Sequence, residues 1–148
     1  MDYYQITAMI ILAVFYAAYF IKMLIQRNQG IRTHQIGRGK KAKRTMMIEK
    51  IMGIATLCVV AAELYSIFQN SAMLQNKAIR SVGLLIAAAG VLLFIGSMTT
   101  MRDSWRAGIS SDKTALVTTG LYRFSRNPAF LGFDLTYIGL LVAFLNPL

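Results

Sequence analysis

The residues best suited to chemistry lie in the segment 113–133, which reads KTALVTTGLYRFSRNPAFLGF. Gly120 predicts a turn, and Tyr122 and Arg126 follow it as polar groups. The next two residues are asparagine and proline, which suit the start of a helix because asparagine can accept from a free amide and proline needs no partner there. The positive end of such a helix beside an arginine can hold a carboxylate or phosphate. A simple interfacial anchor explains the pattern almost as well.

Two acidic residues, Glu63 and Asp134, lie within long apolar runs. Charged residues are costly in lipid and are functional candidates when they occur in a spanning segment. Asp134 follows Phe130 by four residues and precedes Tyr137 by three, so we expect these side chains to share one helix face. The catalytic residues stay open, with Arg126 and Asp134 as candidates. Glu63 lies near the end of its segment and is expected to reach the membrane surface.

The same segment carries a more specific pattern in LVTTGLY at 116–122, RNPAF at 126–130 and Gly132. It resembles the isoprenylcysteine carboxyl methyltransferase family, which has a pattern like L-V-x-x-G-x-Y-x-x-x-R-H-P-x-Y-x-G and whose wider group includes membrane phospholipid methyltransferases. The similarity extends from Thr114 to the Asn146–Pro147 pair and says nothing specific about the first two apolar segments. It implies an integral membrane methyltransferase that uses S-adenosylmethionine without a Rossmann domain and methylates a lipophilic acceptor from the bilayer.

The resemblance also implies which residues hold the cofactor. The segment 114–117 matches one that lines the pocket largely through its backbone, Tyr122 matches a cofactor-contacting tyrosine, and 127–130 matches a His-Pro-x-Tyr quartet. Arg126 would hold that turn in place or lie near a carboxylate. The implied cofactor-binding residues are Thr114, Ala115, Leu116, Val117, Tyr122, Asn127, Pro128, Ala129 and Phe130.

Two positions depart from the family pattern, because Asn127 stands in place of its histidine and Phe130 in place of its tyrosine. Asparagine does not titrate near neutral pH, so acid–base catalysis by that position is excluded. Phenylalanine keeps the ring and loses the hydroxyl. Methyl transfer from a sulfonium can proceed without a titrating base when nucleophile and methyl are aligned, so both departures are compatible with catalysis.

Family members continue through another membrane segment to a cytoplasmic tail, whose acidic pair and late arginine complete the cofactor and substrate sites. The present sequence reads to Leu148. The resemblance therefore implies that residues 1–148 by themselves bind S-adenosylmethionine weakly and are inactive. The alternative is a non-catalytic multi-pass protein, either a degenerate family member or an assembly subunit. The methyl acceptor and the oligomeric state stay open.

The composition of the 148-residue chain indicates where these residues lie. Hydrophobic residues make up 56% and charged residues 15%, and the mean hydropathy is +0.52. Typical soluble domains have roughly 45–50% and about 25%. The apolar excess excludes an intrinsically disordered chain and points to contact with lipid. The net charge of +10 would suit a nucleic-acid partner, but the basic residues lie in loops between apolar runs, so we expect membrane lipids instead.

Four segments are apolar over about 20 residues, the length needed to span a bilayer. We predict an all-α bundle in a single membrane domain, with about four transmembrane helices at 3–25, 46–68, 79–101 and 128–148. Loops 26–45 and 102–127 hold twelve of the 16 Lys and Arg residues, and the other connector holds two. The positive-inside rule therefore places both loops in the cytoplasm and the N-terminus outside, in an inner or plasma membrane.

Small residues predict where the helices approach one another. Gly83, Ala87 and Gly90 form a seam of the kind that permits close contact between spanning helices, and Ala13 and Ala17 repeat the spacing.

The remaining polar features predict little chemistry. The loop segment 26–44 has three glycines and seven positive charges, and we expect it to be flexible and attracted to anionic headgroups. His34 and Cys58 are the only histidine and the only cysteine, so neither a metal site nor an intramolecular disulfide is expected. Cys58 is expected to be a small core residue.

Overall fold

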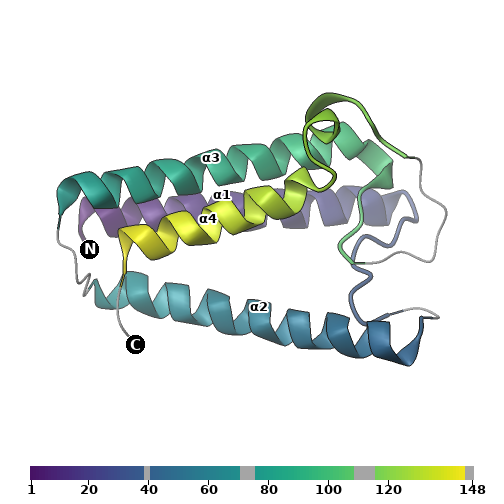
Figure 1. Cartoon of the computed structure of the whole chain (residues 1–148), viewed down its shortest axis with the longest axis horizontal. Coiled ribbons are helices and arrows are strands. Elements are labelled where there is room, and N and C mark those ends of the chain that lie inside the picture. Colours follow the sequence, from purple (N-terminus) through teal and green to yellow (C-terminus); the bar gives the residue numbers. More distant parts are fainter. Residues whose placement is uncertain (39–40, 71–75, 109–115, 146–148) are drawn as a thin grey trace.

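The computed structural model of the chain describes residues 1–38, 41–70, 76–108 and 116–145, and these residues form an all-α bundle (Figure 1). The predicted fold class is confirmed. Two 3-10 turns, η1 (Arg102–Ser104) and η2 (Gly120–Arg123), lie between the last two α-helices. The α-helices are α1 (Tyr3–Asn28), α2 (Lys43–Gln69), α3 (Lys77–Met101) and α4 (Pro128–Ala143).

Three of the four helices are long and apolar enough to cross a membrane. The most apolar windows of α1, α2 and α3 have mean hydropathies of 2.2, 2.0 and 2.3. α4 has 16 residues, which correspond to about 24 Å at 1.5 Å per residue and fall short of a hydrocarbon core of about 30 Å. The predicted span 128–148 is therefore a shorter apolar helix that ends at Ala143, and residues 146–148 lie outside the described part of the chain.

Local side-chain chemistry explains two of the helix starts. Asp2 and Gln5 form a capping box at the start of α1, in which the Asp2 side chain accepts from the Gln5 amide at 2.8 Å and the Gln5 side chain accepts from the Asp2 amide at 2.8 Å. Asn76 caps α3 by accepting from the amide of Ala78 at 2.9 Å. Because α1 and α3 begin at the same end of the bundle, we call it the N-terminal end (Figure 1). The opposite end, with loops 29–42 and 102–127, is the loop end.

The predicted glycine seam is confirmed and forms the closest helix contact, between α3 and α4. A Cβ atom on Gly90 would lie 2.5 Å from the backbone nitrogen of Thr136, and one on Gly83 would lie 2.6 Å from the backbone nitrogen of Ala143. The facing helix contributes its own glycines, Gly132 and Gly139. Backbones this close leave no room for a side chain, so glycine is required on both sides.

α1 packs against this pair through aromatic residues rather than through its small ones. The Phe15 ring lies 4.4 Å from that of Phe94, centroid to centroid, and 5.9 Å from that of Phe133. Ala13 and Ala17, in which we expected a second small-residue contact, are both exposed. The expectation is wrong because α1 turns its larger side chains toward α3.

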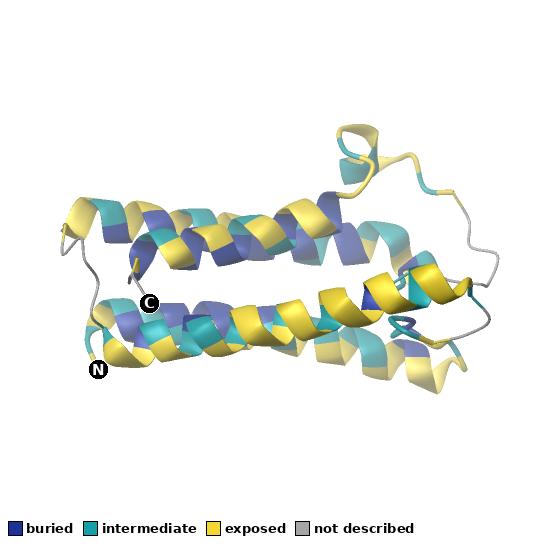
Figure 2. Cartoon of the chain, turned by 60° about the horizontal axis from the view of Figure 1, so that its bottom comes forward, coloured by how far each residue is buried: buried dark blue, intermediate teal, exposed yellow. Residues whose placement is uncertain are grey.

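α2 lies on one side of the other three helices (Figure 1) and packs loosely against them. Its only buried residues are Glu49, Glu63 and Ile67, and most of its surface is exposed (Figure 2). Cys58 is among the exposed residues, so its predicted place in the core is wrong. An apolar helix with so little buried surface is suited to lipid contact.

Candidate functional site

The turn predicted at Gly120 is present and rests on the last turns of α3. Gly120 has φ +60°, and a Cβ atom there would lie 3.0 Å from Cγ2 of Thr100. Leu121 packs beside Gly96, whose added Cβ would lie 3.0 Å from Cδ1 of that leucine. The left-handed backbone of Gly120 and its close approach to Thr100 both favour glycine at position 120. The first half of the motif is thereby fixed to the loop end of α3.

The second half of the motif begins α4, but not with the predicted cap. Pro128 occupies the first helical turn as expected. Asn127 has φ −145° and ψ 65°, which differs from the usual extended geometry of a capping residue, and its side chain makes no capping hydrogen bond. Its backbone amide donates to the Ser125 hydroxyl at 3.2 Å. The predicted capping role of the Asn127 side chain is therefore wrong, whereas the helix start is correct.

The side chains predicted to bind the cofactor differ in burial. Pro128 and Ala129 are buried, and Val117 and Tyr122 are half-buried. Burial raises the pKa of the Tyr122 hydroxyl, which keeps it protonated. The exposed members are Leu116 (91%), Phe130 (52%) and Asn127. Thr114 and Ala115 lie outside the described residues.

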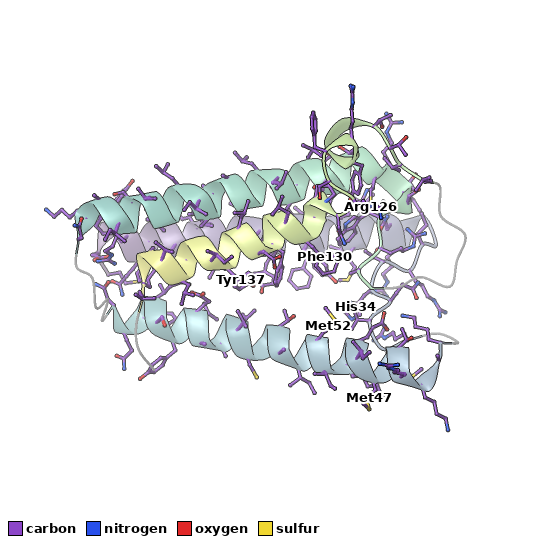
Figure 3. The ribbon with its side chains drawn as sticks, in the orientation of Figure 1. His34, Met47, Met52, Arg126, Phe130 and Tyr137 are labelled. Carbon is purple, nitrogen blue, oxygen red and sulfur yellow. The ribbon has the colours of Figure 1, made fainter. Side chains whose placement is uncertain are left out.

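The candidate catalytic residues are both exposed. Arg126 lies beside the start of α4 at the loop end, where Figure 3 also places Phe130 and His34. Asp134 is exposed, as is Phe130, whereas Tyr137 is buried and its hydroxyl is hydrogen-bonded to that of Tyr16. The three residues expected to share one helix face therefore differ in burial: Phe130 and Asp134 are exposed, and Tyr137 is buried. Within the described part of the chain, Asp134 forms no hydrogen bond or ion pair.

Glu63 contradicts our expectation that it reaches the membrane surface. The residue is only 7% exposed, and its Oε2 atom is buried without a hydrogen-bond partner among the described residues. It lies close enough to Tyr137 for an electrostatic interaction. The spacing in the sequence already indicated that Glu63 shares a helix face with two other residues. Glu63 lies four residues before the apolar Ile67 and 14 residues, about four turns, after Glu49. All three residues face the bundle.

Sequence reasoning missed a hydrogen-bonded network that docks the first loop onto the segment after α3. Gln26 is fully buried; its side chain donates to the Trp105 carbonyl at 3.2 Å and accepts from the Thr33 hydroxyl at 2.6 Å. The backbone amide of Gln35 donates to the carbonyl of Ala107 at 2.8 Å, and the amide of Ala107 donates to the carbonyl of Thr33 at 2.9 Å. The expectation of a flexible loop is therefore wrong for its described residues, because buried polar groups hold it in place.

Ionisable side chains add to this docking. The Nδ1 atom of His34 lies 3.0 Å from the Tyr19 hydroxyl. Lys41 and Glu49 form a buried ion pair at 2.7 Å, and Glu49 also accepts from the amide of Gly37 at 2.9 Å. Burial and the Arg38 guanidinium lower the pKa of His34, and the Glu49 carboxylate opposes this in part. His34 is therefore held mainly in its neutral form at neutral pH.

The loop end thus carries the docked first loop, the Gly120 turn and the start of α4, together with exposed aromatic and basic side chains. In the described ranges, no group of three or more His, Cys, Asp or Glu side chains could hold a metal ion. Comparisons of the chain with protein-family models, curated proteins and solved structures find no match. Basic side chains and the free amides at a helix start suit an anionic group, and exposed aromatic rings suit a cation.

Proposed function

We propose that the chain forms the membrane part of an S-adenosylmethionine-dependent methyltransferase that acts on a lipophilic acceptor. One observation supports this proposal above the others. The two halves of the methyltransferase-like pattern meet at the loop end, where the Gly120 turn packs on α3 and α4 starts at Pro128. α3 and α4 are also the most tightly packed helices, so the two halves have a rigid support.

The side chains at this end fit the chemical groups of S-adenosylmethionine. The guanidinium of Arg126 and the first amides of α4, which have no partner within the helix, are suited to the carboxylate of its methionine part. The exposed ring of Phe130 offers a face to a cation. When bound, S-adenosylmethionine would supply an electrophilic methyl group on a positively charged sulfur.

The chain itself would align the reactants rather than move protons. Asn127 can donate and accept hydrogen bonds without changing charge. Leu131 and Phe130 are exposed on α4 at the point where it enters the apolar layer, which suits an acceptor that arrives from the bilayer. Catalysis by alignment of a nucleophile with the methyl group needs no titrating base.

The exposure of the motif side chains predicts weak binding by residues 1–148. Leu116, Asn127 and Phe130 are exposed, so a bound cofactor would contact these side chains on one side only. A second wall in the resembling enzymes contributes acidic and arginine partners. An open site that makes two fewer charged hydrogen bonds, at about 1.5–3 kcal/mol each, would bind the cofactor roughly two to four orders of magnitude more weakly. We therefore expect binding only at high cofactor concentration, and no turnover.

The test is a titration of the detergent-solubilised chain with S-adenosylmethionine, followed by NMR of isotope-labelled tyrosine and phenylalanine. We expect saturable shifts of Tyr122 and Phe130, and a much weaker response in Tyr122→Ala. Tyr65→Ala is the control, because Tyr65 is exposed near the far end of α2. Shifts that are absent at millimolar cofactor, or that survive Tyr122→Ala unchanged, would refute the proposed site.

A non-catalytic membrane protein is the second candidate, and the exposure of the motif favours it. Asn127 and Phe130, the two positions that depart from the family pattern, are both exposed. A degenerate family member would keep the helix packing and lose the cofactor. It would give no saturable shift in the same titration, with an unchanged melting temperature in all of the variants.

A further inference from the structure

A polar pocket lies at the N-terminal end of the bundle, opposite the methyltransferase-like motif. It has a volume of about 270 Å³ and is formed where α1 and α3 begin and α2 ends. Figure 1 shows these three helix ends together. The lining residues are Asp2, Tyr4, Asn70, Lys77 and Arg80. The proposed methyl transfer uses none of these residues.

Arg80 is the buried cation of this pocket. The residue is 7% exposed. Its Nη1 donates to the Asp2 carboxylate at 3.3 Å, and its Nη2 donates to the Asn70 side chain at 2.7 Å. Its Nε is buried and has no hydrogen-bond partner among the described residues. A buried N–H group without an acceptor is uncommon in folded proteins.

Two aromatic rings fix the position of this guanidinium. Its central carbon lies 4.3 Å from the centroid of the Tyr4 ring and 5.0 Å from that of the Phe144 ring. Cation–π contacts of this kind hold an arginine in place without using its N–H groups. The donors of Arg80 are therefore oriented before any ligand arrives.

The charge of the pocket is unbalanced. Lys77 and Arg80 contribute two positive charges, and Asp2 contributes one negative charge. Partial burial opposes ionisation of Asp2, but hydrogen bonds from Gln5 and Asn70, together with the Arg80 guanidinium, hold its pKa below the usual value. One positive charge remains after this pairing. The start of α3, whose first residue is Lys77, adds the positive end of a helix dipole.

We propose that this pocket binds a phosphate group at the membrane surface, either that of a lipid headgroup or that of a small phosphate ester. Arg80 supplies a guanidinium charge held in place between two rings, and the exposed Lys77 supplies a mobile cation at the rim. Arginine and lysine together are suited to phosphate. The pocket lies at the ends of the spanning helices, which is the level of the headgroups.

The alternative explanation is that Arg80 only ties the helices together. Its contacts with Asp2 and Asn70 do join α1, α2 and α3. Lys77 forms no hydrogen bond or ion pair within the described part of the chain, so its removal leaves this tie intact. A Lys77→Gln variant therefore tests phosphate binding separately from helix packing.

The experiment uses the full chain in the Cys58→Ser background, with Tyr3→Cys carrying an environment-sensitive fluorophore. Tyr3 is 74% exposed and adjoins the pocket residues Asp2 and Tyr4. Inorganic phosphate is titrated in one arm, and bilayers of phosphatidylglycerol or phosphatidylcholine are compared in the other. A saturable fluorescence change with inorganic phosphate supports a soluble phosphate ester as the ligand. A change with phosphatidylglycerol bilayers, but none with inorganic phosphate, supports a lipid headgroup as the ligand.

Lys43→Gln is the matched control, because Lys43 is likewise the exposed first residue of a spanning helix, at the loop end. We expect Lys77→Gln to weaken the apparent affinity about tenfold, the usual effect of losing one charged hydrogen bond, and Lys43→Gln to leave it unchanged. Arg80→Lys should weaken the apparent affinity further. If the Arg80→Lys variant does not fold, the comparison of Lys77→Gln with Lys43→Gln still tests the proposal. No saturable response, or equal responses in Lys77→Gln and Lys43→Gln, would overturn the proposal.

Discussion

Glu63 and Asp134, two acidic side chains within the apolar helices, have opposite surroundings. Glu63 is buried against the bundle beside Tyr137, and Asp134 is exposed on α4. Gly132 and Thr136, on either side of Asp134, pack against Gly90 near the middle of α3. Asp134 is thus an uncovered carboxyl at mid-helix depth, where a charge costs about 2.5–3.5 kcal/mol. A polar ligand that covers it would remove part of that cost.

Asp134→Asn keeps the shape of the side chain and removes its charge. We expect binding of S-adenosylmethionine to weaken about tenfold, the effect of losing one charged hydrogen bond. The melting temperature should not fall, because Asp134 forms no hydrogen bond or ion pair within the described part of the chain. The NMR titration and thermal unfolding check the two expectations, with the exposed Asp103→Asn as a control. Unchanged affinity would remove Asp134 from the site.

His34 predicts a pH dependence of loop docking. Burial and Arg38 lower its pKa from 6.5, so the folded state binds fewer protons than the unfolded state. The contribution of neutral His34 to the free energy of unfolding is complete above pH 6.5. This contribution is lost as the pH falls below that value toward the folded-state pKa. We expect acidification from pH 7.5 to 5.5 to lower the melting temperature by about 1–3 °C, the effect of a fraction of a kcal/mol.

The control for this pH dependence is His34→Asn, in which the side chain does not titrate. Its melting temperature should change less over the same pH interval, as measured by thermal unfolding in one detergent. An equal change in both proteins would show that another group is responsible.

The helices differ in how they are held. α3 and α4 meet backbone to backbone along glycines, whereas α2 is buried only at Glu49 near its start and at Glu63 and Ile67 near its end. The ion pair of Glu49 with Lys41 ties the start of α2 to the docked loop. The tightly packed pair α3 and α4 carries the motif, and the loosely packed α2 leaves much of its apolar surface open to lipid.

Gly90→Ala should separate α3 from α4. The added Cβ would lie 2.5 Å from the backbone nitrogen of Thr136, which cannot move without the helix. We expect a loss of about 1–3 kcal/mol in the free energy of unfolding, as in other overpacked interiors. Gly53→Ala is the control, because its Cβ would make an ordinary contact of 3.8 Å with Ile36. Unfolding in a denaturing detergent, followed by the fluorescence of Trp105, measures both; equal losses would contradict the seam.

At the scale of the whole molecule, the two ends of the bundle have different chemistry. The loop end carries most of the basic residues, the docked loop and the methyltransferase-like motif. The N-terminal end carries the Arg80 pocket. The direct hydrogen bonds of Thr33 and Gln35 with Ala107 require that both basic loops lie on the same side of a membrane. This agrees with the even number of helices that separates them in the expected topology.

The charge asymmetry predicts the orientation. Twelve Lys and Arg residues lie at 26–45 and 102–127, at the loop end, against Lys77 and Arg80 at the N-terminal end. Reporter fusions after Gly39 and after Asp112 should therefore read cytoplasmic, and a fusion after Asn70 should read external. A cytoplasmic signal at Asn70 would contradict the orientation and the assignment of the spans.

The sequence by itself determined the features that depend on local composition. Runs of apolar residues predict spanning helices because the cost of exposing them to water is additive along the chain. Glycine spacing predicted the seam at Gly83 and Gly90, and Gly120 predicted a turn, since both depend on the absence of one side chain. The pattern at 114–132 resembles that of the membrane methyltransferases, and the site that this resemblance implies remains a proposal.

Only the tertiary structure decided which polar groups are buried and what they contact. The burial of Glu63 beside Tyr137, the docking of Gln26 on Trp105 and the clamping of Arg80 between Tyr4 and Phe144 each join residues far apart in the sequence. Periodicity gives the face on which a residue lies but not the neighbour that this face meets. Burial and hydrogen bonding depend on that neighbour, so the environment of these side chains is a property of the assembled helices.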